Sequence, residues 1–152
     1  MNYRTLLSTL GGAVLCGTLW TSANAAEYTV VDDTIPASLT GKAGDPIAGK
    51  KAAINRKKGN CLACHVMPIP EEQFHGEVGP DLSDVGANYS EAELRMRLVN
   101  ARVLNPDTIM PTFLTPGTTD VLKKFEGKTI ISPQEVEDII AYLMTLKGQY
   151  SQ

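Results

Sequence analysis

The stretch GNCLACH, residues 59–65, brings two cysteines and a histidine together in one short segment. In a Cys-x-x-Cys-His motif, the two thiols can add to the vinyl groups of a haem, and the adjacent histidine is brought beneath the iron. The motif therefore predicts one covalently bound haem c, with Cys61 and Cys64 as attachment points and His65 as an axial iron ligand. A chain of this length has a small core, so a bound ring would organise the helices around it.

Two other uses of the same residues compete with haem. A structural zinc site needs four ligands, and His75 is the only other histidine that could join the three residues of the motif. A thioredoxin-like redox pair is expected in a βαβ setting, whereas the pattern around this motif predicts helices. Haem is the main interpretation, and a colourless protein would contradict it.

The second axial ligand is expected from the stretch NPDTIMPTF, residues 105–113. Met110 follows the predicted end of a helix and lies in a loop with two prolines, which can hold the chain extended and direct the side chain inward. A thioether ligand raises the haem potential relative to a second histidine and suits electron transfer. His75 is the alternative ligand.

The other methionines of the exported chain are expected to have no role on the iron. Met67 follows His65 too closely to reach across the ring, so it is expected to pack on the histidine side. Met96 lies between two arginines and is expected at the surface or boundary of a helix. Met144 falls within an apolar helical stripe, where a core position is the common outcome.

A Gly-Pro pair, Gly79 and Pro80, follows the motif at a distance that suits a loop returning beneath the ring. The Pro80 carbonyl is expected to accept a hydrogen bond from the second ring nitrogen of His65, which would fix the orientation of the imidazole. The alternative is a simple tight turn.

Residues 1–25 have the features of a cleaved signal peptide: a basic start, an apolar run at 6–20 and the sequence Ala-Asn-Ala at 23–25. The apolar run is too short to be favoured as a permanent membrane span. Cys16 belongs to this leader. Export predicts a periplasmic location, an oxidising compartment in which an unprotected cysteine pair would normally form a disulfide.

The chain carries 14 Lys and Arg against 17 Asp and Glu, a formal net charge of −3. This balance argues against nucleic acid as a partner. A basic cluster from Lys50 to Lys58 precedes the motif and is expected to be a solvated helix face. A role in docking a redox partner stays open for this cluster.

Helix signals divide the exported chain into an N-terminal extended arm at 26–44 and one domain at 45–152. Capping residues begin three predicted helices, which are 46–58 after Asp45, 91–104 after Ser90 and 133–147 after Ser132. A short helix at 121–125 and a short extended piece at 129–131 are also indicated. The chain shows no internal repeat and no pattern of alternating strands, so the fold class is all-α with long loops.

Several of these stretches together resemble the class I cytochrome c family. They are the haem motif, FHGEVGPDLSDVGANYSEAELR, NPDTIMPTF and ISPQEVEDIIAYLMTLKG. Within that family, these stretches are most similar to sequences of the SoxX family, the mono-haem subunits of SoxAX cytochromes. The resemblance covers residues 45–148, and the NPDTIMP stretch is more specific than the haem motif alone.

The resemblance implies a periplasmic heterodimer with a larger cytochrome subunit, SoxA. That complex, an L-cysteine S-thiosulfotransferase, oxidatively joins thiosulfate to a cysteine of the SoxYZ carrier. The catalytic centre is then expected in SoxA, with no catalytic residue in this chain. The haem ligated by His65 and Met110 would accept the released electrons and pass them to a soluble cytochrome. The alternative is a stand-alone mono-haem electron shuttle; a haem-based ligand sensor would need an open sixth position, which Met110 is expected to fill.

Overall fold

The computed structural model describes residues 27–116 and 122–148. Its elements are, in order, α1 (Pro46–Ala53), η1 (Cys61–Ala63), α2 (Val85–Asn88), α3 (Glu91–Asn100), η2 (Ala101–Val103), η3 (Lys123–Phe125) and α4 (Pro133–Leu143). The described residues contain no strand, only an isolated β-bridge between Val31 and Thr34. The predicted all-α class is therefore confirmed.

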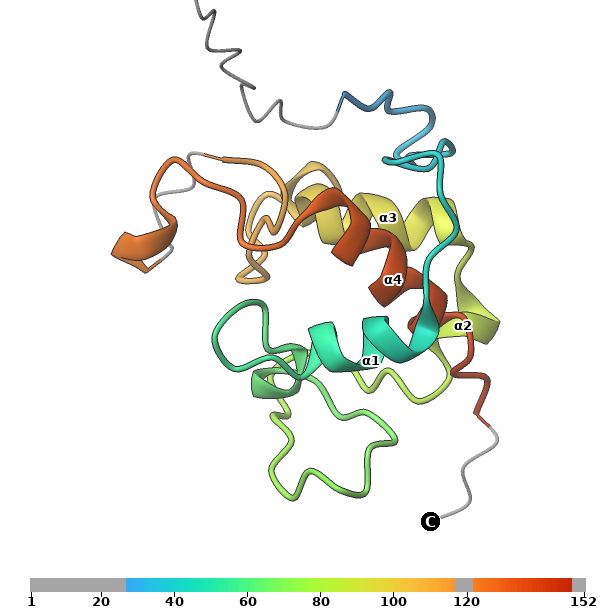
Figure 1. The fold of residues 1–152 in the computed structure, drawn as a ribbon, viewed down its shortest axis with the longest axis vertical. Coiled ribbons are helices and arrows are strands. Elements are labelled where there is room, and N and C mark those ends of the chain that lie inside the picture. Colours follow the sequence, from blue (N-terminus) through green and yellow to red (C-terminus); the bar gives the residue numbers. More distant parts are fainter. Residues whose placement is uncertain (1–26, 117–121, 149–152) are drawn as a thin grey trace, which may run out of the picture.

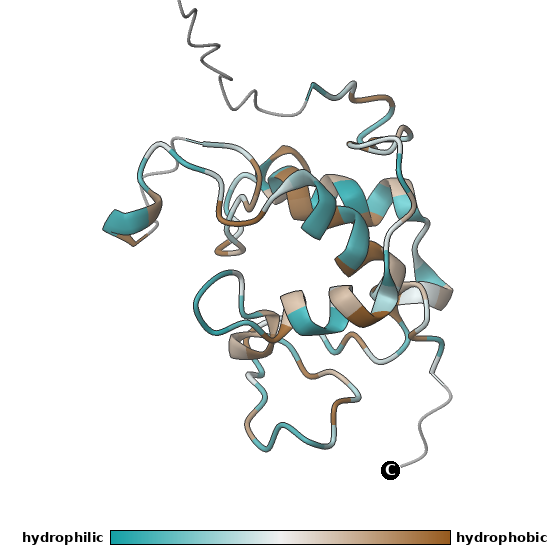
Figure 2. Cartoon of the chain, viewed as in Figure 1, coloured by the Kyte–Doolittle hydropathy of each residue, from teal (hydrophilic) through white to brown (hydrophobic). Residues whose placement is uncertain are grey.

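The crossing of α1 and α4 organises the fold (Figure 1). Glycines allow the close approach, because a Cβ at Gly49 would lie 1.8 Å from the carbonyl oxygen of Asp138. A Cβ at Gly44 would lie 2.1 Å from the carbonyl oxygen of Glu137. The hydrophobic parts of both helices meet where they cross (Figure 2), which buries apolar surface and stabilises the pair. Any larger side chain at Gly49 would force the helices apart.

Both predicted capping boxes are present. The Ser90 hydroxyl accepts a hydrogen bond from the Glu93 N–H, and the Glu93 carboxylate accepts one from the Ser90 N–H. Ser132 and Glu135 make the same reciprocal pair at the start of α4. Each box satisfies two N–H groups that the first helical turn leaves without partners, which is why these starts were predictable.

The predicted helix ends were less accurate. The first helix ends at Ala53 and not near residue 58, since Asn55 takes over the backbone bonding that would extend it. The Asn55 side chain accepts the N–H of Lys57, and its carbonyl accepts the N–H of Lys58. The last helix ends at Leu143, after which the chain turns and Gly148 adopts a left-handed conformation with φ 72°.

Two shorter predictions had different outcomes. The short helix expected at 121–125 is a 3-10 turn, η3, and Val121 itself lies outside the described residues. The short extended piece expected at 129–131 forms no strand. The N–H groups of Ile130 and Ile131 both point to the carbonyl of Phe113, so this segment packs onto the methionine loop without a pairing partner of its own.

Met96 is fully buried, with 0% of its surface exposed, so its predicted surface or boundary position was wrong. The prediction used the flanking arginines as markers of a solvated face. Arg95 is instead buried, and its guanidinium binds both carboxylate oxygens of Glu137 at 2.8 and 2.9 Å. Arg95 also donates to the carbonyl of Ile35, so the arm covers the side of α3 on which Arg95 lies.

The described part of the N-terminal arm lies against the helices as an irregular segment with a tight turn at 31–34, so it is not extended throughout as expected. The N–H of Ile35 donates to the carbonyl of Ala92 in α3, and the N–H of Leu39 donates to the Glu137 carboxylate in α4. The predicted leader at 1–25, with Cys16, lies outside the described residues. Across residues 27–116 and 122–148, no helix is both long enough and apolar enough to cross a membrane.

Candidate functional site

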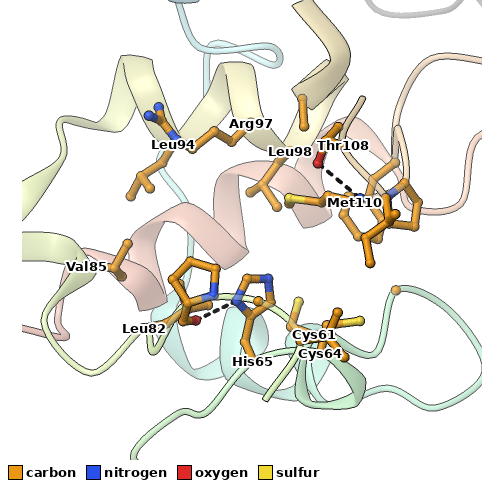
Figure 3. A pocket seen from close by; sticks show the side chains of 18 of the residues that line it. Cys61, Cys64, His65, Leu82, Val85, Leu94, Arg97, Leu98, Thr108 and Met110 are labelled. Carbon is orange, nitrogen blue, oxygen red and sulfur yellow. Dashed lines mark hydrogen bonds between the residues drawn. The ribbon is translucent and has the colours of Figure 1, made fainter. Parts of the chain in front are cut away.

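A cavity of about 640 Å³ lies between the Cys-x-x-Cys-His segment and the loop that carries Met110. On one wall are Cys61, Cys64 and His65, and on the facing wall is the thioether of Met110 (Figure 3). Apolar side chains supply most of the remaining lining, namely Val78, Leu82, Val85, Leu94, Leu98, Leu104, Ile109, Phe113 and Leu143. Predicted ligands far apart in the sequence therefore share one cavity.

The short helix η1 places both thiols on the same wall of this cavity. Neither cysteine is in a disulfide, and the N–H of His65 donates to the carbonyl of Cys61 at 2.9 Å. Burial raises the pKa of the Cys61 thiol to about 11. A reactive redox cysteine needs the opposite, a lowered pKa that favours the thiolate, so the site does not suit a thioredoxin-like pair.

His65 is held in one orientation by the returning loop. Its Nδ1 lies 2.7 Å from the carbonyl oxygen of Pro80, and a carbonyl can only accept, so Nδ1 carries the proton and donates. The Nε2 atom is thereby left with its lone pair free for a metal ion. Gly79 passes so close that a Cβ there would lie 2.4 Å from the His65 Cε1.

Short-range hydrogen bonds shape the loop that carries Met110. The Asn105 side chain accepts the N–H of Asp107, and the Asn105 carbonyl accepts the N–H of Thr108. The Thr108 hydroxyl then accepts the N–H of Met110 at 3.2 Å. Figure 3 shows this bond and the Met110 sulfur pointing into the cavity.

His75, the alternative axial ligand, does not line this cavity. Its Nδ1 accepts the N–H of Met67 at 3.3 Å, and its Nε2 lies 3.0 Å from the carbonyl of Glu72. Both ring nitrogens therefore have backbone partners. The described residues contain no cluster of three or more His, Cys, Asp or Glu that could hold a metal ion. Both observations argue against the zinc alternative and favour Met110 over His75.

The remaining methionines also lie apart from the cavity lining. Met67 is buried, with 2% of its surface exposed, and belongs to the hydrophobic core. Met144 is partly buried and packs against that core. Met110 is thus the methionine that the fold brings opposite His65.

Tyr89 and Arg97 also line the cavity, which no pattern in the sequence predicted. The Arg97 guanidinium stacks over the Tyr89 ring, with Cζ 4.2 Å from the ring centroid. Its Nη1 donates to the Glu93 carbonyl at 3.0 Å. The sequence pattern predicted a buried face at Leu94 and Leu98. Arg97, next to Leu98, has the pattern of a surface residue, and only the structure places it at the cavity.

The basic cluster from Lys50 to Lys58 is largely engaged within the chain. Its ion pairs join Lys50 to Glu71, Arg56 to Glu72 at 3.0 Å and Lys58 to Glu135 at 2.5 Å. Exposed pairs contribute little to stability. Their main effect here is to offset much of the positive charge that a docking surface would present.

The cavity fits a haem c. Its volume lies within the range of about 300–1,000 Å³ that cofactor sites occupy. Two thiols and a histidine with a free Nε2 lie on one wall, a thioether lies on the other, and the lining between them is apolar. Haem bonds to thiols covalently and takes histidine and methionine as axial ligands, so every donor of the predicted set is within the same space.

Known proteins match this chain over most of its length. A family model for cytochrome c matches residues 46–147. A chain of the SoxXA crystal structure from P. pantotrophus is 35% identical with a TM-score of 0.72, covering 80% of this chain and 95% of that chain. Cytochrome c2 of Rhodopila globiformis is 32% identical over 118 residues, covering 68% of this chain and 95% of that protein.

A further relative is longer than this chain. An uncharacterized lipoprotein of Aquifex aeolicus is 30% identical over 95 residues, which is 62% of this chain and 39% of that protein. The chain thus spans about two fifths of that relative's length.

Proposed function

Because the chain belongs to the cytochrome c family, we propose that its covalent haem c is attached through Cys61 and Cys64 and ligated by His65 and Met110. When bound, the haem supplies a one-electron Fe(III)/Fe(II) couple. The residues of the chain tune that couple. Pro80 fixes the imidazole of His65, the Met110 thioether raises the potential, and the apolar lining limits the access of water.

The proposed role is that of the electron-accepting subunit of a SoxXA-type complex. One observation carries this assignment: the match to the SoxXA chain, at 35% identity and a TM-score of 0.72, spans 95% of that chain. By this assignment the partner is a larger SoxA subunit that holds the catalytic centre, and the complex joins thiosulfate to a cysteine of a SoxYZ carrier. This chain then passes the released electrons to a soluble cytochrome.

The chemistry of the site supports electron transfer over substrate turnover in this chain. Cys61 and Cys64 are the cysteines of the described residues, and haem attachment consumes both thiols. His65 and Met110 would fill both axial positions, which leaves no open site for a substrate or a gaseous ligand on the iron. We therefore assign no catalytic residue to this chain.

Co-purification of the native protein from its source tests the complex. We expect a stable companion that is larger and also carries haem, and we expect the pair to conjugate thiosulfate to a SoxYZ cysteine with reduction of the haem of this chain. A monomer that is fully active as a carrier would contradict the assignment.

A stand-alone electron shuttle is the second candidate. It is favoured by the match to cytochrome c2, of which this chain covers 95%. The same purification separates the two candidates. A shuttle would elute alone and exchange electrons with several acceptors, whereas a subunit would elute with its partner.

The predicted leader belongs to the same proposal. We expect cleavage after Ala25, which removes Cys16 and releases the protein to the periplasm. N-terminal sequencing of the purified protein measures this directly, and the expected first residue is Ala26.

A further inference from the structure

We propose that the arm tip, residues 28–34 of the N-terminal arm, is the surface by which this chain docks its larger haem-carrying partner subunit. This inference rests on the proposed SoxXA-type assembly and names the part of this chain that holds the pair together. The site that the arm tip fits on the partner is apolar and is bordered by Lys or Arg side chains.

The arm tip exposes several large apolar side chains close together. Tyr28, Val30 and Val31 have 37%, 42% and 49% of their surface exposed. None of the three belongs to the hydrophobic core or to the residues packed against it. Single exposed apolar residues are common on proteins, whereas a contiguous group of them marks an interaction site. The arm tip therefore has the apolar surface that docking requires.

The arm tip is held in place by the residue that directly follows it. Ile35 is fully buried, its N–H donates to the Ala92 carbonyl, and its own carbonyl accepts from Arg95. Within the tip, Val31 and Thr34 exchange backbone hydrogen bonds of 2.9 Å in both directions. A surface that already has its bound shape loses less entropy on association, so this anchoring favours a stable contact.

Two carboxylates give the arm tip a negative charge. Asp32 and Asp33 have φ angles of 45° and 58°, in the left-handed region, and a two-residue turn of this kind also accepts Asn or Gly. The turn itself therefore does not require the charges. Both side chains are exposed, and neither is in an ion pair within the described residues. Unpaired carboxylates beside apolar side chains favour a partner site with a basic border.

The extent of the matches to known proteins sets the arm apart from the haem domain. The cytochrome c family model covers 46–147 and leaves the arm out. Residues 46–152 are 107 of the 152 residues, about 70% of the chain, whereas the match to the SoxXA chain covers 80% of it. That match therefore extends into the residues before 46, while the match to cytochrome c2 covers 68%. A shared segment outside the haem domain supports a role in assembly.

The arm tip lies apart from the haem site. None of its residues lines the cavity. In Figure 1 the arm, drawn from blue to cyan, lies beside α3 at the opposite end of the molecule from the green loop that follows η1. Changes at the arm tip should therefore leave the visible spectrum and the midpoint potential of the isolated holoprotein as they are.

The test is the affinity of the purified holoprotein for the larger haem-carrying subunit separated from the native complex, measured by sedimentation of the recombined pair. Val30→Ser combined with Val31→Ser should weaken association by about tenfold or more, because the apolar contact is lost. Ile47→Ser is the matched control, since Ile47 is 69% exposed on α1 and lies outside the arm tip. This control should bind as the native protein does.

Asp32→Asn combined with Asp33→Asn tests the charge alone. Asparagine tolerates the left-handed region, so the turn is kept. The variant should bind several-fold more weakly at low salt and should differ less from the native protein at high salt, where charges are screened. An altered spectrum or midpoint potential of this variant would connect the arm tip to the haem site and overturn the inference.

Native affinity in both arm-tip variants would also overturn the inference, and the aspartate variant decides if the valine variant yields no holoprotein. A holoprotein that dimerises through the arm tip would assign this surface to a second copy of the chain, again against the inference. A native protein with no haem-carrying companion would overturn the proposed function instead, so the two failures are distinguishable.

Discussion

The two walls of the cavity are built in different ways. On the histidine wall, backbone hydrogen bonds link the motif to the returning loop: Gly76 N–H to Leu62 carbonyl, Gly79 N–H to Cys64 carbonyl, and Leu82 N–H to Val66 carbonyl. On the methionine wall, a few side-chain bonds within 105–110 hold Met110, and the adjacent Ile109 is 77% exposed.

This difference indicates which of the two axial ligands is held more firmly by the chain. His65 is held by the chain on both sides of it, by the Pro80 carbonyl and by the close passage of Gly79. Met110 depends on a short turn held by a few local bonds, and it is only partly buried against the core. We therefore expect the histidine to stay on the iron when the methionine is displaced.

The largest effect should come from removing the anchor of the histidine wall. Replacing both Cys61 and Cys64 by Ala should abolish covalent haem and prevent stable folding, because the ring fills the centre of the domain. Haem staining after denaturing electrophoresis measures the attachment. Retention of stain in the double variant would show that the anchor lies elsewhere.

Removing the ligand of the methionine wall should have the next largest effect. Met110→Ala should keep covalent haem but lose the charge-transfer absorption between the thioether and ferric iron, and the reduction potential should fall. His75→Ala is the matched control and should keep the band. Loss of the band in His75→Ala alone would reverse the assignment.

A single methyl group tests how closely the histidine wall is packed. Gly79→Ala places a Cβ against the His65 ring, and overpacking of this kind costs about 1–3 kcal/mol. Urea unfolding of the holoprotein should show that loss of stability. Pro80→Ala keeps the accepting carbonyl and should cost less; equal losses in both variants would mean that the close approach is not the cause.

The smallest effect should come from the turn on the methionine wall. Thr108→Val removes the acceptor for the Met110 N–H and should cost about 0.5–1.5 kcal/mol. The loss should appear as earlier disappearance of the charge-transfer band in urea, with global unfolding of the domain little changed. Thr108→Ser keeps the hydroxyl and should behave as the native protein does. Coincident loss of band and fold would contradict the idea of a separately labile wall.

Local signals explain what the sequence predicted well. The haem motif, the two capping boxes and the all-α class each depend on residues a few positions apart, whose chemistry is independent of the rest of the fold. The loop containing Met110 was predictable because its prolines and its distance from the motif left few other candidates. Its supporting bonds from Asn105 and Thr108 were not foreseen.

Long-range contacts explain what the sequence did not predict. Burial of Arg95, next to Met96, follows from its bonds to the arm and to Glu137, which no periodicity within α3 could indicate. The place of Arg97 at the cavity depends on where α2 brings Tyr89. The predicted end of the first helix was wrong for a different reason. The Asn55 side chain hydrogen-bonds to the backbone in place of a further helical turn, and helix propensities do not indicate such a bond.

The buried pair of Arg95 and Glu137 has a consequence for the order of folding. Glu137 joins Leu39, 98 residues earlier, and Arg95, 42 residues earlier, so the arm completes its contacts only when the last helix is in place. Contacts of such sequence separation form late, because the closure of a long loop costs entropy before the contact repays it. In a chain exported as proposed, the junction of the arm with Arg95 and Glu137 therefore closes only after the C-terminal helix is in place.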